Sequence, residues 1–336
     1  MSGAGRAVDA VDPALRGPAA GSGGASARTR TSAPYRTGHD PASVRPMPRA
    51  KANGIEIEYE TIGDAAARPL LLVMGLGCQL TNWPDEFCAG LAERGFYVIR
   101  YDNRDVGLSD YIDQGPQPDM GAVFSGDYSS VPYRIADMAA DAVGLLDALG
   151  IPAAHIAGVS MGGMIVQQIA IDFPERVLSL ASIMSMPGDG ESGKPTRAAL
   201  EALIAPVPGD LAGAVEAGVR TWRTIGSPDY PAPEEELRAR LAAAHARAPR
   251  RDGFTRQFAA IQASPDRTEG LRGVRVPTVV VHGAADQLIA PSGAEATAAA
   301  VPGAELVLLP GMGHDLPREL WPAITDAIVR TADRAS

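Results

Sequence analysis

Hydrophobic and polar residues alternate near residue 55 and give way to short, continuous apolar runs farther along the chain. Ile55–Tyr59 alternates, which predicts a half-exposed strand near the edge of a sheet. Leu70–Met74 is apolar at every position, as expected of a central parallel strand buried on both faces. The same pattern recurs in later runs, at Phe96–Ile99, Ala153–Ala157, Val177–Met184, Thr278–Val281 and Leu306–Leu309.

Apolar residues at helical spacing occupy the intervals between these runs. The predicted helices span Asp85–Arg94, Ile135–Leu149, Met161–Asp172, Ser292–Ala300 and Trp321–Thr331. Because strand and helix alternate, we expect an α/β fold with a mostly parallel central sheet, right-handed crossovers and helices on both faces. The chain has 336 residues, of which 46% are hydrophobic, and this suits one such sheet with an insert.

The alternation stops between residues 187 and 274. This stretch contains no convincing strand, and its Ala, Leu, Glu and Arg residues at helical spacing are interrupted by prolines. We interpret it as a helical lid, or cap, inserted into a core made of residues 47–186 and 275–336, because it begins where strands lead to the mouth of a candidate site. The alternative is a set of structural helices that extend one face of the core.

Composition and charge exclude several classes of function. Residues 1–46 are rich in Gly, Ala, Ser, Pro and Arg and show neither period, so we expect a disordered N-terminal extension. The net charge of −10 argues against a nucleic-acid partner. No apolar run reaches the ~18 residues of a membrane span, and no secretory signal is recognisable, so we expect a cytoplasmic protein. Cys78 and Cys88 are predicted to be buried thiols, and no cysteine-based zinc pattern is present.

The strongest chemical motif follows the run at Ala153–Ala157. Residues 158–162 read Gly-Val-Ser-Met-Gly between a predicted strand and a predicted helix, which is typical of a nucleophile elbow centred on Ser160. The two glycines permit close backbone approach, and the helix start leaves N–H groups unpaired beside the serine. The alternative is a glycine-rich turn in which Ser160 caps the helix.

A nucleophilic serine needs a base, and the base needs an orienting acid. His314 lies in the glycine-containing loop 310–315 after the last apolar run, and it is the predicted base. Asp286, just past the Thr278–Val281 run, is the predicted acid, which gives the order serine, acid, histidine along the chain. Asp189 is the rival acid, although its neighbouring glycines also fit a simple turn.

We expect structural roles for the other aspartate near His314 and for the other histidines. Asp315 is expected to point to solvent or to cap the last helix. Packing or surface roles are expected for the other histidines, which are His39, His155, His245 and His282.

The same site would need two oxyanion donors and a pocket. The predicted donors are the N–H groups of Met161, after the nucleophile, and of Leu76, in the loop after Leu70–Met74. Residues of these types are more often core, but an adaptable apolar pocket could be lined by Met161, Met184, Met186, Trp222, Phe254, Phe258 and Leu288.

Together these residues resemble the α/β-hydrolase superfamily from about Ala52 to the C-terminus. In detail they are similar to the aclacinomycin methylesterase-like serine esterases. Residues 72–75 read Leu-Val-Met-Gly in place of the more usual His-Gly, and the resemblance continues through residues 82–87, 98–109 and 310–314. Asp102 and Arg104 resemble a turn motif of the family that we interpret as structural. The resemblance implies hydrolysis of a carboxylic ester, such as the methyl ester of a polyketide-like compound.

The resulting hypothesis is a serine hydrolase that cleaves a carboxylic ester of a small, largely apolar molecule through an acyl-enzyme. It would require no cofactor and no metal. Alternatives are a perhydrolase or haloperoxidase-like enzyme, or a carbon–carbon bond hydrolase, on the same triad, because a fold does not fix the reaction. A ligand receptor with a slow triad is a further alternative.

Overall fold

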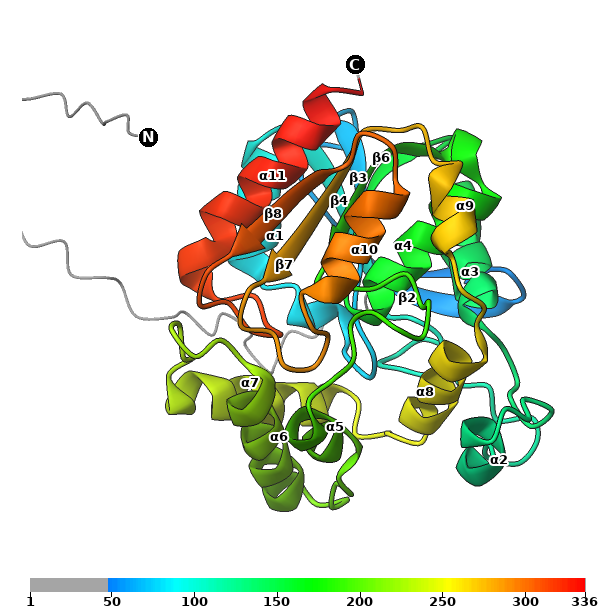
Figure 1. Cartoon of the computed structure of the whole chain (residues 1–336), viewed down its shortest axis with the longest axis vertical. Helices are drawn as coiled ribbons and strands as arrows, with labels where there is room; N and C mark the ends of the chain where they lie inside the picture. Colours follow the sequence, from blue (N-terminus) through cyan, green and yellow to red (C-terminus); the bar gives the residue numbers. More distant parts are fainter. Residues whose placement is uncertain (1–47, 336) are drawn as a thin grey trace, which may run out of the picture. The chain divides into compact units, whose positions relative to one another are not determined.

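Eight strands form one sheet in the order β1-β2-β4-β3-β5-β6-β7-β8 (Figure 1). The computed structural model describes residues 48–335. The pairs β1–β2 and β2–β4 are antiparallel, and every other neighbouring pair is parallel. The strands are β1 (Arg49–Ala52), β2 (Ile55–Ile62), β3 (Arg68–Val73), β4 (Phe96–Tyr101), β5 (Ala154–Val159), β6 (Val177–Ile183), β7 (Thr278–Gly283) and β8 (Glu305–Leu309). The predicted fold class, a mostly parallel α/β sheet, is confirmed.

Helices cover both faces of this sheet. Helices α1 (Asp85–Glu93) and α11 (Trp321–Asp333) pack on one face, and the other face carries α3 (Ile135–Ala148), α4 (Met161–Asp172), α9 (Thr268–Arg272) and α10 (Ser292–Ala300). Each face has its own large cluster of buried apolar side chains. Short 3₁₀ turns lie at Leu80–Asn82, Pro174–Arg176 and Arg318–Leu320.

The central strands are apolar because both of their faces are covered. All six residues of β5 and all six of β7 are buried. The register pairs Val73 of β3 with Gly158 of β5, and Val159 of β5 with Ile183 of β6. The carboxyl ends of these parallel strands therefore meet at one edge of the sheet, where the loops after them converge.

Two details of the sheet differ from the sequence prediction. The run Leu306–Leu309 is not a central strand, because β8 lies at the sheet edge and leaves Leu306 and Leu308 37% and 39% exposed. The opposite face of this strand is better covered, with Leu309 buried and Val307 half-buried, so an apolar run alone does not establish a central position. Strand β1 was not predicted, because its sequence, Arg-Ala-Lys-Ala, has no strongly apolar residue.

Residues 187–274 form helices and contain no strand. Besides α9, this stretch holds α5 (Arg197–Ile204), α6 (Leu211–Ile225), α7 (Glu234–Arg247) and α8 (Gly253–Ala263). Helices α5, α6 and α7 gather beyond one end of the sheet, at the bottom of Figure 1. The short helix α2 (Met120–Phe124), which was not predicted, packs against α8. We call α5–α8 and their connections the cap; its work as a lid stays a prediction.

Three further expectations concerned the N-terminal extension, membrane spans and metal sites. The expected disorder of residues 1–46 lies outside the described residues. Between residues 48 and 335, none of the helices combines the length and the apolar character that a bilayer crossing requires. Within the same range, no group of three or more His, Cys, Asp or Glu side chains is arranged to hold a metal ion.

Candidate active site

Ser160 occupies the turn between β5 and α4 in a backbone conformation that non-glycine residues rarely adopt. Its φ is 56° and its ψ is −121°. The turn is held because the Ser160 N–H donates to the Ile183 carbonyl at 2.9 Å and the Ser185 hydroxyl donates to the Ser160 carbonyl at 2.8 Å. Close approach explains the flanking glycines: a Cβ on Gly158 would overlap the backbone of Gly162. The side chain of Ser160 therefore stands out from the sheet edge.

His314 lies between Ser160 and Asp286. Its Nδ1 is 2.7 Å from Oδ2 of Asp286, and its Nε2 is 3.0 Å from the Ser160 hydroxyl oxygen. When the Nδ1–H donates to the carboxylate, Nε2 is left as an acceptor for the serine hydroxyl. The three groups come from the loops after β8, β5 and β7, so the sheet edge brings together residues that are 154 and 28 positions apart.

Asp286 is fixed by more than the histidine. Its Oδ1 accepts from the backbone N–H groups of Leu288 and Ile289 at 2.8 and 3.0 Å. His282, assigned a packing role above, is fully buried and places Nε2 3.4 Å from Oδ2 of Asp286. Burial lowers the pKa of His282, so this imidazole is neutral near pH 7. Its Nε2 also lies 2.8 Å from the Ile289 carbonyl oxygen, which fixes the ring beside the carboxylate.

Asp189, the rival acid, lies in a turn of its own. Its Oδ1 accepts from the N–H groups of Glu191 and Ser192 and from the Ser192 hydroxyl at 2.8–2.9 Å. Burial raises its pKa, but these hydrogen bonds outweigh that effect and lower the pKa overall. Asp189 thus serves its local turn, while Asp286 is the carboxylate in contact with His314.

The loop after β3 runs beside Ser160. A Cβ on Gly75 would lie 3.1 Å from the Ser160 Cβ, so only glycine fits there without displacing the serine. Leu76 follows in the cavity wall, and Met161 begins α4, where its N–H has no carbonyl partner within the helix. Both predicted donors therefore flank Ser160.

Gln257 fixes this loop from the cap, and sequence reasoning missed it. The side chain is fully buried in α8. Its Oε1 accepts from the Gly77 N–H at 2.8 Å, and its Nε2 donates to the Arg104 carbonyl at 2.7 Å. A glutamine in an ordinary helical pattern carries no signal of such a role, because its partner at Gly77 is 180 residues away.

A cavity of about 540 Å³ opens on Ser160 and His314. Every predicted side chain other than Met161 lines it: Met184, Met186, Trp222, Phe254, Phe258 and Leu288. Met161 instead points into the hydrophobic core and is fully buried. Cys78, predicted to be buried, is only half-buried and lies in the cavity wall, whereas Cys88 is enclosed. Both thiols are free, and burial raises the pKa of Cys88 to about 12.

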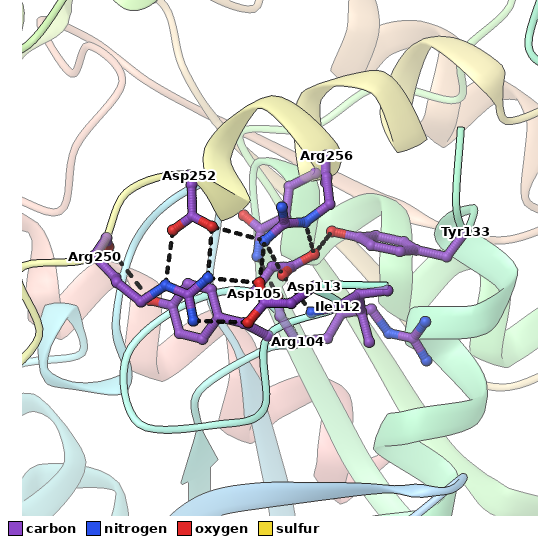
Figure 2. A network of polar contacts seen from close by, with 10 residues as sticks. Arg104, Asp105, Ile112, Asp113, Tyr133, Arg250, Asp252 and Arg256 are labelled. Atoms are coloured by element: carbon purple, nitrogen blue, oxygen red, sulfur yellow. Dashed lines mark hydrogen bonds and ion pairs between the residues drawn. The ribbon is translucent and has the colours of Figure 1, made fainter. Parts of the chain in front are cut away.

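A network of ion pairs fastens α8 to the core (Figure 2). Arg256 donates two hydrogen bonds to the buried Asp105, at 2.9 and 2.7 Å, and the Tyr133 hydroxyl donates a third at 2.6 Å. At the rim, hydrogen bonds from Arg250 lower the pKa of Asp252 to about 2. The neighbouring turn is closed by Asp102, which accepts from the N–H groups of Leu80 and Leu108, and by the Arg104–Asp141 pair. These contacts hold the aromatic face of α8 against the cavity.

The loop that carries His314 is bonded to the end of α6. The His314 N–H donates to the Ile225 carbonyl at 2.7 Å, and the Gly313 N–H donates to the Ser227 hydroxyl oxygen at 2.9 Å. Asp315 was expected to point to solvent or to cap the last helix, and it does neither. Its carboxylate accepts from the N–H and the hydroxyl of Ser227, because that segment of the cap covers it.

The comparisons with known proteins place the fold in a family. A family model described as the alpha/beta hydrolase fold matches residues 68–317. The chain belongs to the α/β-hydrolase family. This α/β-hydrolase is 32% identical over 290 residues to rhodomycin D methylesterase DauP of Streptomyces sp. (strain C5), an alignment that covers 80% of this chain and 92% of the relative. It is 31% identical to rhodomycin D methylesterase DnrP of Streptomyces peucetius, with the same shares covered. The predicted resemblance is thereby confirmed.

A solved structure supports the same fold. The enol-lactonase from Burkholderia xenovorans LB400 superposes on this α/β-hydrolase with a TM-score of 0.65. The two are 24% identical, and the match covers 85% of this chain and all of that one. At this identity the likeness speaks for the fold alone.

Proposed function

We propose that the protein is a serine hydrolase that cleaves a carboxylic ester of a small, largely apolar molecule through an acyl-enzyme. Its family and its similarity to two methylesterases identify it as an α/β-fold carboxylic ester hydrolase. One observation carries the mechanism: the His314 ring contacts the Ser160 hydroxyl on one side and Asp286 on the other. This arrangement supports Ser160 as nucleophile, His314 as general base and Asp286 as the acid that orients it.

In the first half of the reaction, the Ser160 oxygen attacks the ester carbonyl carbon while its proton passes to Nε2 of His314. The carbonyl electron pair moves to the oxygen, and the N–H groups of Leu76 and Met161 donate to the resulting anion. The negative charge of Asp286 stabilises the imidazolium. The carbon–oxygen bond of the ester then breaks, and the alcohol leaves with the proton that His314 returns.

In the second half, a water molecule attacks the acyl-enzyme. His314 takes a proton from the water, the bond to Ser160 breaks, and the serine recovers its proton as the carboxylic acid leaves. Every step uses side chains and backbone N–H groups of this chain and water. No cofactor takes part.

The cavity supports a bulky apolar substrate. Its volume of about 540 Å³ lies in the range of pockets that enclose drug-sized molecules, and its wall contains Met and aromatic side chains. The two relatives are named rhodomycin D methylesterases. We therefore include in the proposal the methyl ester of a polyketide-like compound as the substrate class.

The test is a panel of methyl esters of increasing size, from acetate to polycyclic aromatic acids, assayed with wild type, Ser160→Ala and His314→Ala. Wild type should hydrolyse the bulky esters with a higher kcat/KM, and each variant should lose roughly 10⁴-fold in kcat. An organophosphonate should label wild type once and leave Ser160→Ala unlabelled. Turnover of a peracid or a vinylogous diketone, with none of simple esters, would select the perhydrolase or carbon–carbon hydrolase alternative instead. Labelling without product release would select the receptor.

A further inference from the structure

Arg240 of α7 lines the same cavity as Ser160 and is half-buried. Its Nε is enclosed by protein and has no hydrogen-bond partner among residues 48–335. The whole side chain makes no hydrogen bond or ion pair with these residues, so the guanidinium donors at the cavity wall remain available to a bound molecule. The guanidinium is held in place by the Trp222 ring, whose centroid lies 5.3 Å from its central carbon.

Of the three arginines in the cavity wall, Arg250 is ion-paired, whereas Arg240 and the exposed Arg251 form no ion pair with residues 48–335. Arg238, two positions earlier on the same helix, donates to Glu216 and Glu234 and does not line this cavity. Arg250 in the cavity wall pairs with Asp113 and Asp252. No carboxylate of the described residues lies within ion-pair distance of Arg240, although the chain as a whole carries an excess of acidic residues.

The charge of Arg240 also acts on residues in the loops on either side of Ser160. Burial raises the pKa of Asp315, the neighbour of His314, and the charge of Arg240 is among the effects that oppose this rise. The same holds for Cys78, two residues after Leu76, where burial raises the pKa and Arg240 opposes it. Arg240 and, at Cys78, Arg251 thus bring positive charge to the wall of the cavity.

We propose that Arg240 is a specificity-determining residue that donates hydrogen bonds to an ionised oxygen, a carboxylate or a phenolate, on the ester substrate. This inference rests on the proposed function for the identity of the substrate as an ester. The aromatic wall would hold the apolar body of the molecule, and the guanidinium would fix its direction in the cavity. A substrate of this class is an apolar ring system that carries the scissile ester and a separate acidic group.

Binding to the Ser160→Ala variant tests the proposal without any need for turnover. The ligands are the monomethyl esters of terephthalic, naphthalene- and biphenyl-dicarboxylic acid, which place a carboxylate at increasing distance from the ester, and their dimethyl counterparts. Calorimetry should give, for at least one spacing, roughly 10- to 100-fold tighter binding of the monomethyl ester. A second set of ligands tests a phenolate in place of the carboxylate. Binding of methyl hydroxynaphthoate and of its methoxy analogue is measured at pH values below and above the pKa of the phenol, and these measurements form the phenolate arm.

Substitutions assign the preference to one side chain. In the Ser160→Ala background, Arg240→Met should remove the preference and leave the affinity for the dimethyl esters within about threefold, whereas Arg240→Lys should retain part of it. Arg238→Met is the matched control, because it removes the same charge from the same helix outside the cavity, and it should keep the preference. Circular dichroism melting of each variant checks that the cap remains folded.

The outcomes separate this proposal from the proposed function. Equal affinity of charged and neutral ligands at every spacing and in the phenolate arm would overturn the role of Arg240, and so would an equal effect of Arg238→Met. Wild-type hydrolysis of any of these esters would meanwhile leave the esterase proposal standing. Conversely, a preference that depends on Arg240, with no ester cleaved by wild type, would support the acidic ligand and defeat the esterase.

Discussion

The sheet edge and the cap meet at one cavity, but they are held in place by different means. At the sheet edge, Ser160 has its position because backbone atoms of β3, β5 and α4 lie so close together that glycine is required around it. In the cap, α8 has its position because side chains such as Arg256 and Gln257 reach buried partners in the core. The first region is set by backbone geometry and the second by side-chain pairs.

The difference explains how such a fold can keep its chemistry while it changes its substrate. A cap held by a few polar pairs can be rebuilt by substitutions that never touch the strands. The elbow tolerates no comparable change, because a side chain at residue 158 or 162 would overlap backbone that cannot move aside. Substitutions on the two sides should therefore have effects of different kind and size.

The largest effect is expected for the acid at the sheet edge. Asp286→Asn removes the charge that orients and stabilises the His314 imidazolium, so kcat should fall about 10³- to 10⁴-fold while KM changes little. Asp189→Asn should change kcat less than a few-fold, because Asp189 bonds only within its own turn. Steady-state kinetics on one methyl ester compares the kcat of the two variants. A larger loss of kcat in Asp189→Asn than in Asp286→Asn would assign the role of the acid to Asp189.

A smaller loss is expected where the cap supports the chemistry. Gln257→Met removes the acceptor for the Gly77 N–H and frees the loop that presents Leu76, so kcat should fall roughly 10- to 100-fold with KM little changed. Binding of a boronic acid that forms an anionic adduct on Ser160 should weaken in parallel. Gln167→Met is the control: this residue is equally buried but bonds Ser182 and Arg267, away from the loop.

If Gln167→Met lowers kcat as much as Gln257→Met does, the loss reflects general loosening of the core, and the comparison between the two regions fails at this position.

A change of selectivity rather than of rate is expected at the aromatic wall. Trp222→Ala and Phe258→Ala should each change the ratio of kcat/KM between bulky and small esters by about 10-fold, because a well-packed contact is lost only for the bulky ester. The rate at which a small organophosphonate labels Ser160 should stay the same. An unchanged ester ratio in both variants would show that the cap only supports the fold and does not select the substrate.

The smallest effect concerns the acid stability of the sheet. Burial lowers the pKa of His155 in β5 to about 4, below its ordinary value of 6.5. The unfolded chain therefore binds a proton that the folded chain excludes, and stability is lost as pH falls from about 6.5 to about 4. Urea unfolding across this range should show a steeper decline for wild type than for His155→Gln. His245→Gln, on α7 of the cap, should decline like wild type; a decline that all three share would exclude His155 as its cause.

The sequence predicted the parts of the site that local pattern determines. The elbow is encoded in five consecutive residues, and the loops of Asp286 and His314 each follow an apolar run, so both the fold and these positions could be predicted. The cavity lining was predicted from residue type and region, and only Met161 points elsewhere, because the first turn of α4 directs its side chain into the core. The proposed catalytic roles themselves await the experiments above.

What the sequence could not predict depends on contacts between distant segments. Gln257 reaches Gly77 across 180 residues, and Asp315 meets Ser227 across 88. Neither pair has a spacing or a composition that distinguishes it from exposed polar residues. The same limit applies to β8, because whether an apolar strand is central or at an edge depends on a neighbour that would have to come from elsewhere in the chain.

The bonds between the base loop and the end of α6 act as a mechanical interlock. His314, Gly313 and Asp315 are each tied to residues 225–227, so α6 cannot be lifted from the sheet without breaking these bonds or drawing the imidazole away from Ser160. A movement of α6 that kept these bonds would therefore take the imidazole away from Ser160. In such a displaced state Ser160 would lack the base that we propose for it, so movement of the cap and the proposed chemistry would be coupled through one loop.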